Sequence, residues 1–155
     1  MIVKLEVSEK IIWSCLVLNR FKALMDELVE IANKLGVSGA KLINARDIIV
    51  EDYLTGLCRD PKCENYGSCI NCPPYVLSPS AFYRLLADYQ SAILFKIDVS
   101  SDALLSDNRR IDFRLLHRIA ATLERSAVKK GFNKAKSFAG GSCKQIFCKN
   151  YKKCC

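Results

Sequence analysis

The chain has 155 residues, of which 50% are hydrophobic and 26% charged, and its formal net charge is +8. This length and composition are typical of one globular domain with a hydrophobic core of its own, and they exclude a miniature scaffold that depends on disulfides. The longest early apolar run, residues 11–18, is too short to cross a bilayer. We therefore expect a single cytoplasmic domain over residues 1–155, with no membrane contact.

The first third of the chain predicts a helix followed by strand structure. Apolar residues recur at helical spacing from Phe21 to Leu35, and Gly36 is placed to end that helix. The earlier run at residues 11–18 is expected to be a buried strand or the start of this helix. Residues 40–50 read as one or two strands, and their last three residues are β-branched.

The rest of the chain alternates between helices and strands. A Ser-Pro pair at residues 78–79 is typical of a helix start, and residues 91–99 predict the clearest strand. After a polar loop at 100–107, a long helix is expected to end at Gly131, and a last strand is expected at residues 134–139. This alternation favours an α/β fold, in which helices pack on a small layered sheet.

Eight of the nine cysteines fall into two tight clusters. In a reducing compartment, such clusters indicate metal binding rather than disulfides. The first cysteine segment is residues 58–75 (CRDPKCENYGSCINCPPY), and the second cysteine segment is residues 143–155 (CKQIFCKNYKKCC). Both fit the pattern C-x4-C-x-N-Y-x2-C, so the two loops are expected to bind in similar ways. The candidate ligands are Cys58, Cys63, Cys69, Cys72, Cys143, Cys148, Cys154 and Cys155.

Both cysteine segments follow predicted strands, so we expect the two to lie near one edge of the domain. Thiolate is a soft ligand, and sets of four thiolates select zinc or iron–sulfur clusters. The proline after Cys72 and the glycine pair before Cys143 favour one or two iron–sulfur clusters of the [4Fe–4S] type. Zinc is the alternative, although structural zinc sites usually have two short C-x2-4-C pairs and only one is present. The single histidine, His117, is far from both segments in sequence and is expected on a helix surface.

The second segment offers fewer good ligands than the first. Cys154 and Cys155 are adjacent, and neighbouring side chains seldom bind one metal together. The fourth ligand then lies beyond residue 155, the site keeps an open position, or the two segments share one metal centre. Cys15 lies alone in an apolar run and is expected to be a buried small hydrophobic residue.

Three stretches, CENYGSCINCPPY, SAILFKID and LERSAVKKGFNKAKSFAGGSCKQIFC, resemble a domain-of-unknown-function family of predicted cysteine-rich metal-binding proteins. The family is common in methanogens and other anaerobes, and the resemblance covers roughly residues 36–155. Members continue past this point with a further cysteine and an Arg-Pro-Ser stretch, so a truncated second site is expected. The resemblance implies metal binding, usually supposed to be iron–sulfur, through Cys58, Cys63, Cys69, Cys72, Cys143, Cys148 and one of Cys154 or Cys155.

The charge distribution leaves three functions open. From Arg125 onward the chain has eight lysines and no acidic residue. These lysines offset the charge of about −2 on each four-thiolate site, or they contact an acidic partner. The favoured prediction is a redox protein that passes electrons to an acidic protein. The alternatives are a zinc-stabilised module whose basic C-terminal region contacts nucleic acid or an acidic protein, and an enzyme or assembly factor that uses an open metal position.

Overall fold

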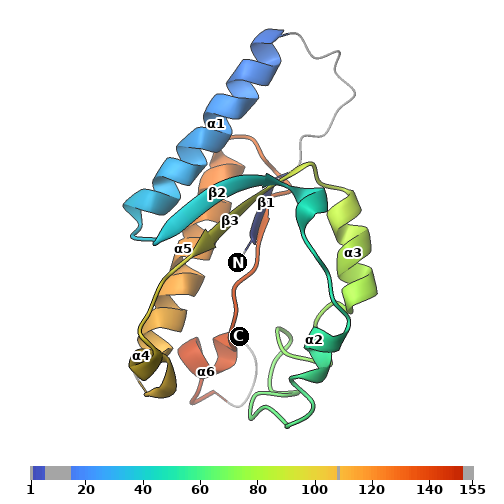
Figure 1. Cartoon of the computed structure of the whole chain (residues 1–155), viewed down its shortest axis with the longest axis vertical. Coiled ribbons are helices and arrows are strands. Elements are labelled where there is room, and N and C mark those ends of the chain that lie inside the picture. The colour runs from blue at the N-terminus through green and yellow to red at the C-terminus, as the bar shows by residue number, and fades with distance from the viewer. Residues whose placement is uncertain (1, 6–14, 108, 152–155) are drawn as a thin grey trace.

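The computed structural model describes residues 2–5, 15–107 and 109–151, with residues 2–5 and 15–18 described by their backbone alone. Two long helices, several short ones and four strands follow one another along the chain (Figure 1). The elements are β1 (Ile2–Leu5), α1 (Cys15–Lys34), β2 (Gly39–Asn44), the 3-10 helix η1 (Ala45–Asp47), α2 (Tyr53–Gly56), α3 (Pro79–Ala87), β3 (Ser91–Lys96), α4 (Ser101–Leu105), α5 (Arg109–Lys129), β4 (Lys136–Ser137) and α6 (Cys143–Phe147).

The four strands form one antiparallel sheet in the order β2-β3-β1-β4. In the β2–β3 pair, for example, Leu42 lies opposite Ile93. With α1 between β1 and β2 and α5 between β3 and β4, the chain follows the βαββαβ arrangement known as ferredoxin-like. That label describes only the course of the backbone and does not imply that the chain binds an iron–sulfur cluster. The prediction of helices packed on a small layered sheet is confirmed.

The hydrophobic core lies between the sheet and the two long helices. Met25 and Leu28 of α1 and Leu123 of α5 are fully buried there, against Ile93 and Phe95 of β3. In β3 the side chain between these two, Leu94, is 43% exposed. Because successive side chains of a strand point to opposite faces, α1 and α5 both cover the same face of the sheet.

Several predicted boundaries are confirmed by local geometry. The helices α1 and α5 end just before Gly36 and Gly131, whose φ angles of 89° and 98° suit glycine and stop a helix. The Ser78 hydroxyl accepts the backbone N–H of Ala81 at 3.2 Å and so caps α3 at the predicted Ser-Pro start.

Other boundaries differ from the predictions. Residues 48–50 are not a strand, because the Asn44 side chain accepts the N–H of Arg46 and turns the chain out of β2 into η1. Ile49, one of the β-branched residues, is 82% exposed. The predicted loop at 100–107 contains the short helix α4, which the Ser100 hydroxyl caps. The strand β1 was not predicted, and the expected last strand shortens to two residues in β4.

The two cysteine segments lie together at the end of the molecule drawn lowermost in Figure 1. The first occupies the long connection between β2 and β3, and the second follows β4. The strands β2 and β4 form opposite edges of the sheet. The predicted proximity of the two segments is therefore confirmed, but it does not come from neighbouring strands. Long loops beyond the sheet bring them together.

The core predicts a strong effect of one truncation on α5. Leu123 is fully buried, so Leu123→Ala should lower the free energy of unfolding by about 2–5 kcal/mol through lost contacts and a cavity. Leu115→Ala on the same helix is the matched control, because Leu115 is 40% exposed and should lose less than about 1 kcal/mol. Urea denaturation followed by circular dichroism measures both. Equal losses in the two variants would contradict the assignment of the core.

Candidate metal centre

The first cysteine segment is wound into a series of tight turns. The N–H of Cys63 donates to the carbonyl of Cys58 at 3.0 Å, and the N–H of Cys72 donates to that of Cys69 at the same distance. The N–H of Gly67 reaches the Pro73 carbonyl at 2.7 Å and closes the loop. These bonds satisfy the backbone locally, so the loop holds its shape without strand pairing.

Cys69 and Cys72 form a close pair of buried thiols in this segment. Their sulfurs lie 3.5 Å apart, and the residues are only 4% and 6% exposed. Two thiolates on one tetrahedral metal stand about 3.8 Å apart when each metal–sulfur bond is about 2.3 Å. The pair therefore already has the spacing of a C-x2-C metal knuckle.

The surroundings of this pair stabilise one thiolate. Burial raises the pKa of the Cys69 thiol, but hydrogen bonds from Cys72, from the backbone of Asn71 and Lys144, and from the Ser142 hydroxyl outweigh burial and leave this pKa below its usual value. The pKa of Cys72 is raised, first by burial and then by its neighbour Cys69. The thiolate is the form that binds a metal, so the pair is partly prepared for that role.

The second cysteine segment packs directly against the first. The Asn71 side chain donates to the Cys143 sulfur at 3.2 Å, and the Ser142 hydroxyl lies 3.9 Å from the Cys69 sulfur. On the outer side, the Gln145 side chain accepts from Asn65 at 3.3 Å and donates to a Glu64 carboxylate oxygen at 2.6 Å. The two segments are therefore parts of one site region.

The shared sequence pattern forms the same turn at the tyrosine of both segments, where the tyrosine N–H donates to the carbonyl of the second cysteine at 3.0 Å, but the stretch before that cysteine folds differently. Cys143 begins the helix α6, and the N–H of Cys148 donates to the Lys144 carbonyl within a helical turn. Arg114 of α5 holds this helix by donating to the Ile146 carbonyl at 3.1 Å. Cys148 is buried. The pattern of cysteines, asparagine and tyrosine thus predicts candidate ligands and a common turn, but not a common backbone between the first two cysteines.

Cys58, Cys63 and Cys72 line a cavity of about 450 Å³ between the first segment, the start of α5 and α6. Within the described part of the chain, no group of three or more His, Cys, Asp or Glu side chains converges tightly enough for a single metal ion. Three thiols of this segment line the cavity, and the fourth, that of Cys69, lies beside Cys72. This soft donor set fits a metal bound through thiolates.

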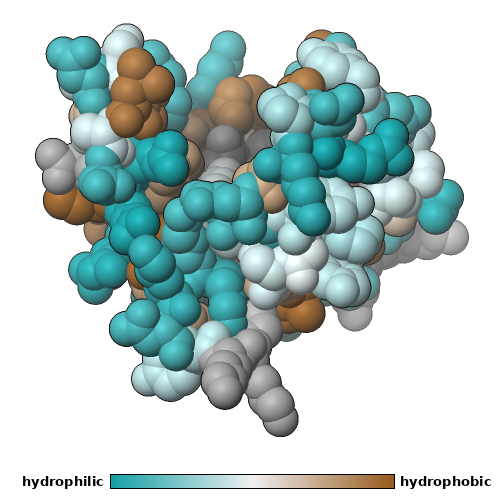
Figure 2. Space-filling view, turned by 90° about the horizontal axis from the view of Figure 1, so that it is seen from below, coloured by the Kyte–Doolittle hydropathy of each residue, from teal (hydrophilic) through white to brown (hydrophobic). Residues whose placement is uncertain are grey.

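Two arginines stand at the wall of this cavity. Arg109 and Arg110, at the start of α5, line it together with the cysteines. Arg109 also lies 3.8 Å from the carboxylate of Glu64, which is an exposed residue. Figure 2, viewed onto this end of the molecule, shows mainly hydrophilic side chains with small separate hydrophobic areas. The guanidinium groups provide positive charge where thiolates would concentrate negative charge.

Residues 41–155 match a family described as "Predicted metal-binding protein (DUF2284)". The chain belongs to this family. The match spans both cysteine segments, confirms the resemblance found in the sequence and supports metal binding by this cysteine-rich chain. No curated protein and no solved structure matches the chain. Membership in this family therefore supports a metal site without naming the metal.

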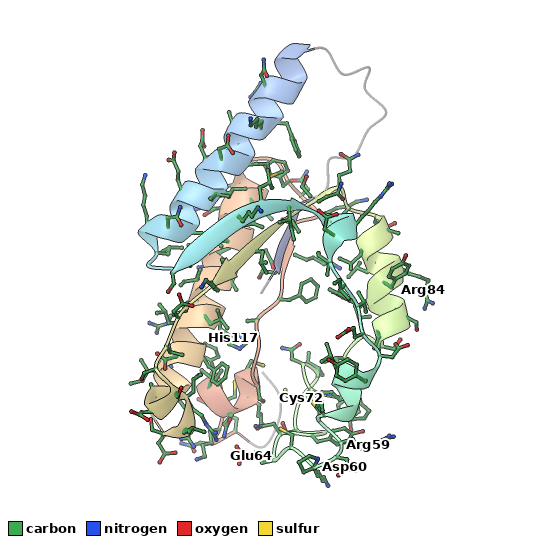
Figure 3. All side chains as sticks on the ribbon, in the orientation of Figure 1. Arg59, Asp60, Glu64, Cys72, Arg84 and His117 are labelled. Atoms are coloured by element: carbon green, nitrogen blue, oxygen red, sulfur yellow. The ribbon has the colours of Figure 1, made fainter. Side chains whose placement is uncertain are left out.

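His117 is the residue whose environment the sequence misjudged. It was expected on the surface of its helix, but its Nε2 atom is buried and has no hydrogen-bond partner among the described residues. Its ring packs edge-on against Phe147 of α6, with 5.8 Å between centroids, and points from α5 toward the chain that follows β4 (Figure 3). Burial lowers the pKa of His117, and backbone hydrogen bonds to Gly140 and Gly141 only partly oppose this.

Some predictions fall outside what the structure describes. Cys154 and Cys155 lie outside the described residues, so their part in a second site stays a prediction. Cys15 begins α1, but its side chain is likewise outside the description. None of the helices in the described part of the chain combines the length and apolar character that a membrane crossing needs.

Serine variants test which thiols hold the metal of this family member. We expect Cys69→Ser and Cys72→Ser each to lower the bound metal per chain to roughly half or less, because a neutral hydroxyl is a poor ligand for a soft-ligand site. Cys15→Ser is the matched control, since α1 begins at the opposite end of the molecule in Figure 1. Metal analysis after anaerobic gel filtration measures all three, and an equal loss in Cys15→Ser would count against the assignment.

Proposed function

We propose that the protein binds an iron–sulfur cluster of the [4Fe–4S] type through the first cysteine segment and passes electrons to an acidic protein partner. The observation that carries this proposal is the cavity of about 450 Å³ with Cys58, Cys63 and Cys72 on its wall. Cysteines that bind a cubane cluster reach different irons, so they surround a volume and do not meet at a point. Cys69 is the fourth ligand in this proposal, and its sulfur, which lies 3.5 Å from that of Cys72, would have to move away from Cys72 so that the two bind different irons.

Hydrogen bonds to the proposed ligands support a redox role. The backbone of Asn71 and Lys144 and the hydroxyl of Ser142 all interact with the Cys69 sulfur. Such bonds to ligand sulfur stabilise the more negative, reduced state of a cluster and raise its reduction potential. Lys144 belongs to the second cysteine segment, and Ser142 directly precedes it. The second segment would therefore tune the reduction potential of a cluster even without binding it.

The surface around the site supports docking by charge. Cys58 and Cys63 are only half-buried, so a cluster between them would lie close to the exterior. Arg109 and Arg110 add positive charge beside it, and the face in Figure 2 lacks a broad hydrophobic area. Transient electron-transfer partners meet through such complementary charge, which steers encounter without slowing release.

A single zinc ion is the second candidate, and one distance favours it. The separation of 3.5 Å between the Cys69 and Cys72 sulfurs suits two ligands of the same tetrahedral ion. Cys58 and Cys63 would then have to move inward to complete the set. The protein would be a zinc-stabilised module, and its lysine-rich C-terminal region, with Lys149 exposed, would contact nucleic acid or an acidic protein.

The metal itself decides between the two candidates. Protein purified without oxygen should contain about four iron and four sulfide per chain, with broad visible absorption that bleaches on reduction with dithionite. Inductively coupled plasma mass spectrometry, sulfide analysis and an absorption spectrum give these values. Colourless, folded protein with about one zinc per chain would overturn the iron–sulfur proposal in favour of the zinc module.

Charge-driven electron exchange has its own test. In stopped-flow experiments, the reduced protein should be oxidised by the anionic acceptor ferricyanide at a rate that falls with added salt. Arg109→Gln/Arg110→Gln should slow this reaction roughly threefold or more at low ionic strength, because it removes positive charge beside the cavity.

The double variant Arg20→Gln/Lys22→Gln is the matched control, since it removes the same charge from exposed positions on α1, away from the cysteine segments. The neutral acceptor benzoquinone should react alike with all three proteins. Equal slowing by both double variants would contradict a docking surface at the start of α5.

A further inference from the structure

A second and larger cavity, of about 720 Å³, lies beside the thiol-lined cavity. It is bounded by α3 and α5, by the end of the first cysteine segment and by the chain that follows β4. Its volume is in the range of about 300–1,000 Å³ that small-molecule sites occupy. Asn71, Ala139 and Gly141 line both cavities, so a molecule bound in the larger one would lie next to the candidate metal centre.

Glu124 of α5 is a half-buried acidic residue on the wall of this cavity. Its Oε2 atom accepts the N–H of Ser137 at 2.6 Å, which ties the helix to β4. The other oxygen, Oε1, has no partner among the described residues, and none of their lysine or arginine side chains pairs with this carboxylate. A charge that is partly removed from water is unfavourable unless it is paired, and this chain has a net charge of +8. Glu124 is therefore placed to bind a positively charged ligand.

Aromatic side chains line the cavity close to this carboxylate. Phe138 directly follows Ser137, the residue that Glu124 binds, and its ring packs edge to face against Phe82 of α3 with 5.2 Å between centroids. Both rings line the cavity together with Tyr75. Much of the remaining lining is apolar and comes from Ile70, Val76, Leu77, Ala120 and Ala121. Aromatic faces attract cations, and a carboxylate accepts strong hydrogen bonds from an ammonium group, so this lining suits an amine on an apolar body.

One cation, Arg125, lies next to Glu124 on α5 and also lines the cavity. Its guanidinium donates to the Thr122 hydroxyl at 3.3 Å. Residues two apart on a helix point about 200° apart around its axis, so Thr122 lies on the side of α5 opposite Glu124. The hydrogen bond therefore directs the positive charge of Arg125 away from the carboxylate and leaves the carboxylate to a ligand.

We propose that this cavity binds a protonated amine on an apolar body of about the size of a phenylethyl group. The ammonium group donates to Oε1 of Glu124, and the apolar body lies among Phe82, Phe138 and Tyr75. Because the guanidinium of Arg125 is directed toward Thr122, a carboxylate on the ligand gains no cation and repels Glu124. The ligand class is therefore amines and not amino acids. The inference concerns this cavity alone and holds for either metal at the cysteines.

Calorimetric titration of the full-length protein, purified anaerobically with its metal, tests this proposal. The probe 2-phenylethylamine should bind saturably at one per chain. The analogues 2-phenylethanol, which has the same body without a charge, and L-phenylalanine, which adds a carboxylate, should each bind at least about tenfold more weakly. No saturable binding of the amine overturns the proposal, and so does equal or tighter binding of either analogue.

The variant Glu124→Gln tests the carboxylate. Glutamine keeps an oxygen that can accept the Ser137 N–H, so the tie between α5 and β4 is preserved while the charge is lost. This variant should weaken binding of 2-phenylethylamine about tenfold or more and leave binding of 2-phenylethanol unchanged. Glu30→Gln is the matched control, because it removes the same charge from an exposed position on α1 that does not line the cavity. Equal weakening in the two variants would overturn the proposal.

A second variant, Ala121→Leu, tests the location of the site. Ala121 is half-buried on the cavity wall, and leucine fills part of the cavity without lowering helix propensity much. Binding of the amine should weaken about tenfold or more, whereas Ala23→Leu, at an exposed position on α1, should leave it unchanged. Full affinity in Ala121→Leu would place the amine elsewhere and overturn the proposal. Metal content is measured on the same samples, so a failed ligand site and a failed metal assignment are told apart.

Discussion

Contact between the two cysteine segments assembles the candidate metal centre. Asn71 binds the sulfur of Cys143, and Ser142 approaches that of Cys69, so thiols from distant parts of the chain share one hydrogen-bonded environment. Buried sulfur that carries negative charge needs such donors or a metal to replace water. The βαββαβ sheet supplies a rigid platform, and the connections that leave its opposite edges meet beyond it. The thiol-lined cavity lies where these connections meet.

The sequence predicts those parts of the fold that local chemistry decides. Helix ends at Gly36 and the capped start at Ser78 follow from the backbone freedom of glycine and from a hydroxyl that accepts an N–H. Residues 48–50 fail as a strand because a strand also needs a partner, and the turn at Asn44 leads the chain away from the sheet. The order of the strands, and with it the approach of the two segments, depends on long-range pairing that no local pattern carries.

The sequence likewise predicts only part of the candidate site. Cysteine chemistry and spacing predict the thiols and restrict the metal to zinc or iron, but they do not predict whether the thiols converge or surround a volume. His117 has no sequence signal as a buried acceptor, because its position depends on how α5 packs against the chain after β4. The family match adds metal binding. The cluster and its redox partner are proposals that follow from how these groups are arranged in space.

We infer that cysteine thiolates hold the metal of this family member where the two segments meet. X-ray absorption spectroscopy at the edge of the bound metal, on anaerobically purified protein, tests it most directly because it reads the ligand atoms themselves. We expect the atoms nearest the metal to be sulfur alone, at about 2.3 Å. A first shell of oxygen or nitrogen, or a folded protein that holds no metal, would contradict it.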